Sequence, residues 1–517
     1  MSDQITVLDN SNIVESYPGL TLPLTYSFIQ VAYRGVFHGL VKENLKNDEV
    51  LAKFDDIFAN MIANHNGRVY YCINNWYSLL DFLPFSKKIT PTWQDMMGVQ
   101  NTDVYLGQRH KFTVGQKTKL YANILRSAFR VPRDMAQLDR DFQAVKQYFE
   151  ETYDDALSME ALLDLYDEIV ERVLNKWYVT LSNDLYAFIW TGLLKHRLKK
   201  KGIDDVAAYI SGITSLESLK PVKSLLEIAK AHGDTPDLLH LPAVQEYIAL
   251  YGDRSPCELK LEVMTYREDP ALLEEKIRQY AADPAKLDEM LAKLEKTQQA
   301  GRGRILKNAR RGIEQRETSR LNRSRIYGMV RRVFLQIGVQ LHQKGMIDDP
   351  HDVFYLEIDE IRSGNFSNIA QRKADYQAYE TMPAHSRLML RDGEVIDEAM
   401  AANIWSGEFT GIGTSTGSIT AEAVVLESPN NSIDVKGKII VTQTTDPGWV
   451  FLLTMAGGIV AEKGSLLSHT AIVSRELGIP AVVAVEHATS VIKTGDIIEI
   501  NGETGRIQVV RSHSIHR

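Results

Sequence analysis

The spacing of apolar residues changes near residue 403, and this change constrains the fold more than any other feature of the chain. Before it, apolar residues recur every three or four positions, which is the period of an amphipathic helix. After it, short apolar runs alternate with Gly-rich breaks, which is typical of strands. We therefore predict a multidomain protein, α and α/β, with a large, mainly helical domain over residues 1–402 and a small α/β domain after it. The helical segments cover residues 28–63, 137–201, 272–299 and 304–346.

The C-terminal part reads as a linker followed by alternating strands and helices. Residues 403–418 are rich in Gly, Ser and Thr, so we expect a linker of tight turns there. Residues 419–511 then hold strand-like runs and two segments that are long enough for helices. The strand-like runs are AEAVVLE, GKIIVTQ, GGIVAE, AVVAV, DIIEI and RIQVV, and the helical segments are GWVFLLTMA and SHTAIVSREL.

Composition and charge exclude several classes of protein. The chain has 517 residues and a formal net charge of −8, whereas proteins that bind nucleic acid or anionic membranes usually carry a basic balance. Its two cysteines, Cys72 and Cys257, are too few for a disulfide framework and too far apart for a zinc pair. No signal peptide and no membrane-spanning apolar stretch is recognisable. These features fit a cytoplasmic protein that binds neither nucleic acid nor membrane.

One histidine, His469, stands at the start of a predicted helix. Ser468 is a good N-cap, so His469 takes the first helical position, and Gly478 ends the helix. The unpaired N–H groups and the positive dipole at such an end would stabilise a phosphoryl group on the imidazole. The apolar side of this helix turns to the core, so we expect His469 at the exposed tip. From this pattern alone, an ordinary solvated histidine and a nucleophile that attacks phosphorus both remain open.

The segment GSLLSHTAIVSRELGIPAVVAV, residues 464–485, resembles the phosphohistidine signature of the PEP-utilising enzymes. This family includes PEP synthase, pyruvate phosphate dikinase and rifampicin phosphotransferase. The similarity continues with TTDPGWVFLLTMAGGIVAEKG before the signature and GDIIEINGETGRIQVV after it. It implies that residues 419–511 form a swivelling domain and that His469 is the phosphoryl carrier, with Gly464 and Ser468 beside it in the catalytic motif.

The helical part is similar to the substrate-binding domain of rifampicin-phosphotransferase-like proteins. The resemblance rests on NIVESYPGLTLPLTYSF and YGDRSPCELKLEVMTYREDP. It makes Glu15, Thr25, Asp253, Arg254 and Glu258 candidates for binding an acceptor. Asp253 stands where many relatives have histidine, so its carboxylate is a candidate base. Caps, turns and ion pairs explain the same residues equally well, and both interpretations stay open.

Residues 299–332 form a basic stretch in an acidic chain. They include eleven Arg or Lys and two Glu, and Arg316, Arg320 and Arg323 share one face of the predicted helix. Because guanidinium groups suit phosphoryl oxygens, Arg316 and Arg320 are candidates for binding a phosphoryl group or an anionic substrate. A solvated basic face explains the pattern as well. A nucleic-acid site is the third interpretation, although aromatic residues for base stacking are nearly absent here.

Family members that load the histidine from ATP carry an ATP-grasp domain, usually ahead of the segment with which this chain begins. No glycine-rich phosphate loop precedes Asn12. The resemblance therefore implies a phosphotransferase component with no cofactor or metal of its own. A separate ATP-grasp subunit would load His469 with ATP and Mg²⁺, and the phosphoryl group would pass to a small-molecule acceptor. Two alternatives remain: a non-catalytic binding or scaffold protein that keeps the fold, and a part of a longer polypeptide, against which Met1 argues.

Overall fold

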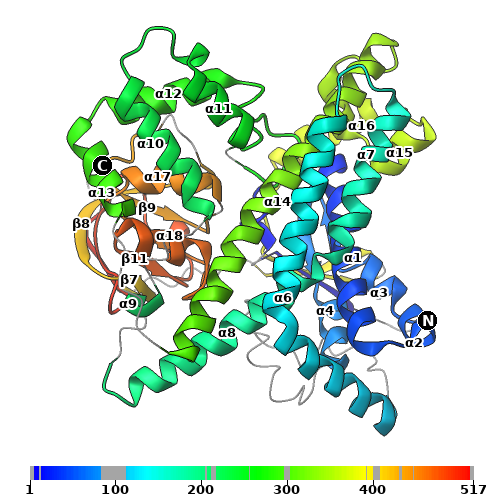
Figure 1. Ribbon diagram of the computed structural model, residues 1–517, viewed down its shortest axis with the longest axis horizontal. Coiled ribbons are helices and arrows are strands. Elements are labelled where there is room, and N and C mark those ends of the chain that lie inside the picture. The colour runs from blue at the N-terminus through cyan, green and yellow to red at the C-terminus, as the bar shows by residue number, and fades with distance from the viewer. Residues whose placement is uncertain are drawn as a thin grey trace. The chain divides into compact units, whose positions relative to one another are not determined.

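The computed structural model describes residues 5–10, 13–82, 112–203, 207–210, 217–255, 257–295, 303–391, 393–399, 408–429, 433–445 and 447–512. The chain divides into two compact units, whose elements are labelled in Figure 1. The first unit comprises Met1–Asn183, Lys260–Glu262 and Met329–Ala401, and the second comprises Asp184–Leu259, Val263–Gly328 and Ala402–Arg517. The long helix α14 (Arg304–Gln343) contributes residues to both units.

An antiparallel sheet in the order β2-β3-β1-β4-β5 lies in the first unit. Strand β1 pairs with β3 on one side and with β4 on the other, so the two ends of this unit's sequence share one sheet. The prediction of mainly helical structure before residue 403 misses these strands, because runs of four to six residues are too short to show a period between long helices. The strands are β1 (Ile5–Asp9), β2 (Ile62–His65), β3 (Arg68–Cys72), β4 (Arg387–Arg391) and β5 (Glu394–Ala399).

The helices of the first unit bury one apolar face each, as their spacing predicts. In α14, which confirms the helix predicted over residues 304–346, the apolar residues spaced by three and four are buried. They are Val330, Val333, Phe334, Ile337 and Leu341. The other helical elements are η1 (Ile13–Glu15), α1 (Pro23–Leu45), α2 (Asp48–Ala52), α3 (Asp55–Ala59), α4 (Ile73–Ser78), η2 (Leu79–Phe82), α6 (Val114–Thr152), α7 (Met159–Arg172), η3 (Leu174–Lys176), η6 (Pro350–Tyr355), α15 (Ile358–Ser363) and α16 (Ile369–Glu380).

The second unit contains a helical segment and an eight-stranded sheet in the order β6-β13-β12-β8-β9-β10-β11-β7. Strands β8, β9, β10 and β11 are parallel neighbours, and the outer strands are antiparallel. The helical elements are α8 (Tyr178–Lys199), whose first turns belong to the first unit, α9 (Ala207–Ile210), η4 (Glu217–Leu219), α10 (Lys220–His232), η5 (Leu238–His240), α11 (Pro242–Tyr251), α12 (Pro270–Ala281) and α13 (Pro284–Glu295).

All the strands and helices predicted after residue 418 are present. They are β8 (Ser418–Val425), β9 (Ile439–Thr442), α17 (Val450–Met455), β10 (Gly458–Ala461), α18 (His469–Leu477), β11 (Ala481–Val483), β12 (Ile497–Asn501) and β13 (Arg506–Arg511). Two short helical elements, η7 (Pro447–Trp449) and α19 (Ala488–Val491), were not predicted. The segment predicted as a linker contains two more strands, β6 (Glu408–Thr410) and β7 (Ile412–Ser415), at the two ends of the sheet order. Backbone pairing overrides the turn-like composition there. The predicted domain boundaries stay a prediction.

The parallel strands are covered on both faces, which explains their continuous apolar sequences. One face packs on α17, α18 and residues of α10–α13 in a single core, and Figure 1 shows α17 between this sheet and α10. The other face packs on β12, β13 and α19. Among the described residues, no helix combines the length and apolarity that crossing a bilayer requires.

Candidate active site

Local backbone constraints place His469 at the start of α18. Gly464 has φ of +137°, a conformation that residues with a Cβ rarely adopt. A Cβ on Gly464 would lie 3.0 Å from both Ser468 Oγ and Val483 Cβ, so the loop passes close to the helix start. Ser468 Oγ accepts a hydrogen bond from the backbone N–H of Ala471 at 3.3 Å. The predicted N-cap and the first helical position of His469 are therefore confirmed.

His469 is buried, with only 2% of its surface exposed, so the expectation of an exposed imidazole is wrong. The first half of α14 covers the start of α18. Leu467 and Ile472 pack in one apolar core with Ala309 and Ile313 of α14. The pattern of α18 shows which of its faces enters the core. It contains no information about a second helix that covers its N-terminus.

Glu317 of α14 is a charged group that faces His469. Its Oε2 lies 3.4 Å from His469 Nδ1, and both side chains are at most 1% exposed. No described residue forms a hydrogen bond with either ring nitrogen of His469. A carboxylate beside Nδ1 favours the tautomer with its proton on that nitrogen, which leaves the lone pair on Nε2. In that tautomer Nε2 is the basic nitrogen of the ring.

Thr470, the residue after His469, ties the first turn of α18 to the loop after β9. Its Oγ1 lies 2.8 Å from Oγ1 of Thr445, and both side chains are buried. Together with the Ser468 cap, this contact holds the first turn, and with it His469, from two sides.

Arg316 and Arg320 lie in the same stretch of α14 as Glu317. Arg316, Arg320 and Arg323 are all partly buried. Arg316 Nε lies 3.4 Å from Asp184 Oδ1, and the Arg316 side chain is 21% exposed. The guanidinium groups of Arg316 and Arg320 therefore belong to residues within one helical turn of Glu317.

Asp253, Arg254 and Glu258 are joined to other charged residues of the second unit. Arg254 Nε donates to Glu258 Oε1 at 2.5 Å, and both side chains are at most 3% exposed. Asp253 Oδ1 accepts from Arg267 Nε at 2.7 Å. Asp253 also packs against α14: a Cβ added to Gly328 would lie 2.3 Å from the Cβ of Asp253. These contacts favour the ion-pair interpretation of the three residues.

Thr25 is buried at the start of α1, in the first unit. Its Oγ1 donates to Glu262 Oε2 at 2.5 Å and accepts from the backbone N–H of Leu261 at 2.9 Å. Thr25 therefore fixes the segment Lys260–Glu262 to α1. The side chain of Glu15 lies outside the described residues.

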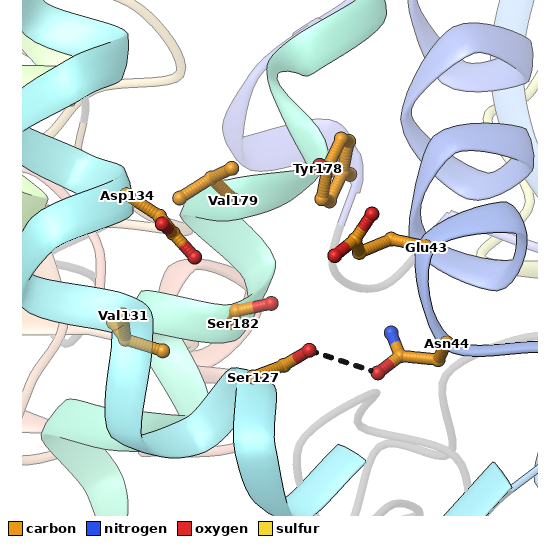
Figure 2. Close-up of a pocket in the computed structure, with 8 residues that line it drawn as sticks. All are labelled: Glu43, Asn44, Ser127, Val131, Asp134, Tyr178, Val179 and Ser182. Atoms are coloured by element: carbon orange, nitrogen blue, oxygen red, sulfur yellow. Dashed lines mark hydrogen bonds between the residues drawn. The ribbon is translucent and has the colours of Figure 1, made fainter. Parts of the chain in front are cut away.

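A small polar pocket in the first unit lies between α1, α6 and the first turns of α8 (Figure 2). Its volume is about 270 Å³, including space open to solvent. Arg130 pairs with Glu43 at 3.5 Å and with Asp134 at 3.4 Å. Burial raises the pKa of the Asp134 carboxyl, and Arg130 opposes that shift. Because Arg130 compensates both carboxylates, we assign no ligand to this pocket. The lining residues are Glu43, Asn44, Ser127, Val131, Asp134, Tyr178, Val179 and Ser182.

Comparison with known proteins identifies the region around His469. Residues 433–505 match the family model described as PEP-utilising enzyme, mobile domain. The rifampicin phosphotransferase of Bacillus subtilis (strain 168) is 29% identical over 335 residues, which are 59% of this chain and 38% of that protein. The rifampicin phosphotransferase of Bacillus cereus is 31% identical over 214 residues, 40% of this chain and 24% of that protein.

Another relative, an uncharacterized protein of Mycobacterium tuberculosis (strain ATCC 25618 / H37Rv), is 24% identical over 97% of this chain and 61% of its own length. The chain thus spans from 24% to 61% of the length of these three relatives. One solved structure, aconitase X of Thermococcus kodakaraensis in its holo form, aligns with 20% of this chain and 99% of its own at 17% identity, with a TM-score of 0.18, too low to support a statement about the fold. The comparisons show a PEP-utilising enzyme mobile domain over residues 433–505 and similarity to rifampicin phosphotransferases.

Glu317 is the residue that the sequence reasoning missed, since it was counted only as an acid within a basic stretch. Its spacing contained a signal. Ala309, Ile313 and Glu317 recur every four positions, so Glu317 continues the apolar face of α14. A carboxylate on the buried face of a helix needs a partner, and a histidine is one that can serve.

Proposed function

We propose that this chain is a phosphotransferase component in which His469 carries a phosphoryl group to a small-molecule acceptor. The observation that carries this proposal is the buried pair of His469 and Glu317, at 3.4 Å, within the stretch that matches the mobile domain of PEP-utilising enzymes. Similarity to rifampicin phosphotransferases supports the same reaction type.

Loading and delivery each break one bond to phosphorus and form another. In loading, Nε2 of His469 attacks a phosphoryl group of the donor, a P–N bond forms, and the bond to the donor's oxygen breaks. The Glu317 carboxylate, 3.4 Å from Nδ1, stabilises the positive charge that the ring acquires. In delivery, an acceptor hydroxyl attacks phosphorus, the P–N bond breaks, a P–O bond forms, and the hydroxyl proton leaves to a base or to water.

Arg316 and Arg320 are the groups we assign to the transferring phosphoryl oxygens. Phosphoryl transfer depends mainly on positioning and on compensating charge over three oxygens. Both guanidinium groups lie on α14 beside Glu317, and the backbone N–H groups at the start of α18 add positive potential. We propose that these groups together provide the hydrogen bonds and positive charge that water would otherwise supply to the phosphoryl oxygens.

We propose that the donor is ATP with Mg²⁺, bound by a separate ATP-grasp subunit. The proposal comes from the resemblance to the PEP-utilising enzymes. For a domain to receive and then deliver a phosphoryl group, it has to leave one partner and reach another. We therefore propose that residues 419–511 move as a swivelling domain.

Labelled ATP tests this function. The full chain is incubated with γ- or β-labelled ATP, Mg²⁺ and candidate ATP-grasp proteins, and label on the chain is measured before and after mild acid. We expect label that is stable at alkaline pH, labile in acid, and absent in His469→Ala. His342→Ala, on α14, is the matched control and should label normally. Label that survives His469→Ala, or ligand binding without any label, would favour the scaffold interpretation.

A further inference from the structure

Helix α8 is apolar on two opposite sides within the second unit. On its inner side Ala187, Leu194 and Leu198 are buried and share one core with α14 and the start of α18. On its outer side four large apolar side chains are between 45% and 56% exposed, namely Leu185, Phe188, Ile189 and Leu193. Single apolar residues are ordinary on a protein surface, whereas a continuous apolar face marks an interaction site.

The four exposed residues form one face, which we call the outer face of α8. They recur at positions i, i+3, i+4 and i+8, the spacing with which a helix contacts another helix or a groove. Gly192 lies among them, and a Cβ added to it would meet no other atom within 4 Å. A helix that is apolar on both sides is normally buried on both. The outer face therefore has the character of an interface.

Exposed basic residues continue the outer face toward the end of α8 and just beyond it. This basic block comprises Lys195, Arg197, Lys199, Lys200 and Lys201, and no described residue forms an ion pair with any of them. Arg304 and Lys307, at the start of α14, are exposed as well. A surface with an apolar part followed by a cationic part fits a partner whose apolar face is followed by acidic residues.

A second copy of α8 lacks these acidic residues. In a parallel pair of α8 helices, the two basic blocks would repel each other. In an antiparallel pair centred on the outer face, each block would lie beside residues 177–183 of the other copy, which contain no acidic residue. A lipid surface fits poorly too, because helices that lie on membranes carry a polar, basic side opposite their apolar one. In α8 the opposite side is apolar and buried.

We infer that the outer face of α8 and the basic block together form the docking surface for the separate ATP-grasp subunit. The inference rests on the proposed function, in which that subunit loads His469. Residues 184–199 of α8 belong to the same unit as His469 but lie outside residues 419–511. A subunit docked on α8 therefore stays attached while residues 419–511 move, and its effective concentration near His469 remains high. The docking surface takes no part in the chemistry.

Binding of purified candidate ATP-grasp proteins to the full chain tests the outer face. The chain carries His469→Ala and no ATP is added, so calorimetry measures affinity without phosphorylation. Phe188→Ser combined with Ile189→Ser should raise the Kd at least ~10-fold, because central apolar side chains dominate the affinity of an interface. Leu250→Ser combined with Met264→Ser is the matched control. These two residues are 45% and 44% exposed in the same unit, and their loss should change the Kd less than about twofold.

Charge reversal tests the acidic character of the partner. Lys199→Glu combined with Lys200→Glu should raise the Kd about 10-fold at low salt and much less at about 0.5 M salt, because salt screens exposed charges. The α8 variants are then labelled from ATP with His469 intact. The partner concentration that gives half the maximal rate should rise as the Kd does, and the maximal rate should stay unchanged, because α8 only holds the subunit.

An unchanged Kd in the Phe188→Ser, Ile189→Ser double variant overturns the inference, and so does the absence of binding by every candidate protein. Loss of self-association in that variant, or loss of binding to vesicles of phosphatidylserine and phosphatidylcholine, also overturns it, because a second copy or lipid would then cover the face. Binding that depends on α8 without any label would contradict the proposed function alone. Normal half-saturation in the labelled α8 variants would contradict the docking surface alone.

Discussion

The second unit contains two buried pairs of an acidic and a basic side chain, and the two pairs differ in the distance and hydrogen bonding between their partners. Arg254 and Glu258 meet at 2.5 Å with a donating Nε and an accepting oxygen. His469 and Glu317 are equally buried, but their nearest charged atoms are 3.4 Å apart, and no described residue hydrogen-bonds the imidazole nitrogens. The direct hydrogen bond of the first pair is typical of a structural ion pair, whereas reactive groups are often held loosely until a substrate completes the site. We therefore expect the first pair to serve stability and the second to serve the proposed chemistry.

Replacement of Glu317 should produce the largest functional change with little structural change. In Glu317→Gln the amide can donate to Nδ1 and favour the wrong tautomer, so the rate at which His469 gains a phosphoryl group should fall by ~10²–10⁴-fold. The free energy of unfolding should change by no more than about 1 kcal/mol, since a buried carboxylate is replaced by a neutral group of similar shape. Initial rates of labelling from ATP, with urea denaturation in parallel, measure both.

Glu314→Gln is the matched control for Glu317→Gln, because Glu314 lies one turn earlier on the same helix. It should label at the rate of the unmodified chain. Equal losses of rate in the two variants would show that the charge of α14, and not the contact with His469, is what matters.

Replacement of Glu258 should show the opposite pattern. Glu258→Gln leaves the guanidinium of Arg254 buried without its counter-ion, which typically costs about 3–5 kcal/mol of stability. We expect the transition that unfolds the second unit to move to lower urea by that amount, while any molecules that remain folded label His469 normally. If Glu258→Gln instead leaves stability unchanged and abolishes labelling, the assignment of the two pairs is reversed.

The N-caps of two helices give the smallest and most closely matched comparison. Ser468 caps α18 and Ser158 caps α7 through the same contact, at 3.3 and 3.2 Å. Replacing either by Ala should destabilise its unit by about 1 kcal/mol. Ser468→Ala should also slow labelling several-fold, because the first turn of α18 positions His469, whereas Ser158→Ala should not. Thermal unfolding and initial labelling rates of the two variants test this difference.

The sequence predicted the helix and strands around His469 because their signals are local. Each element can be predicted from a short stretch of sequence. Ser468 marks the start of an apolar helix and Gly478 its end. Continuous apolar runs indicate buried parallel strands. Contacts between distant segments could not be read in this way. The burial of His469 depends on α14, more than a hundred residues earlier, and the sheet of the first unit pairs β1 with β4 across most of that unit.

The same limit applies to the other candidate residues. Glu317 was treated only as one acidic residue in a basic stretch, although it lies on the buried face of α14. Thr25, Arg254 and Glu258 carry the right atoms for binding, yet in the structure those atoms contact other parts of the protein. Residue type shows what a side chain is able to do, and only its partners show whether it is available.

The measurement that tests the central claim most directly is the location of the phosphoryl group on the loaded chain. Tandem mass spectrometry under non-acidic conditions identifies the residue, and ³¹P–¹⁵N correlation spectra of the histidine-labelled protein identify the nitrogen. The arrangement of Glu317 beside Nδ1 predicts one phosphoryl group, on His469 and on Nε2. Phosphate on Nδ1 would contradict the role given to Glu317, and phosphate on any other residue, or none with an active ATP-grasp partner, would contradict the function itself.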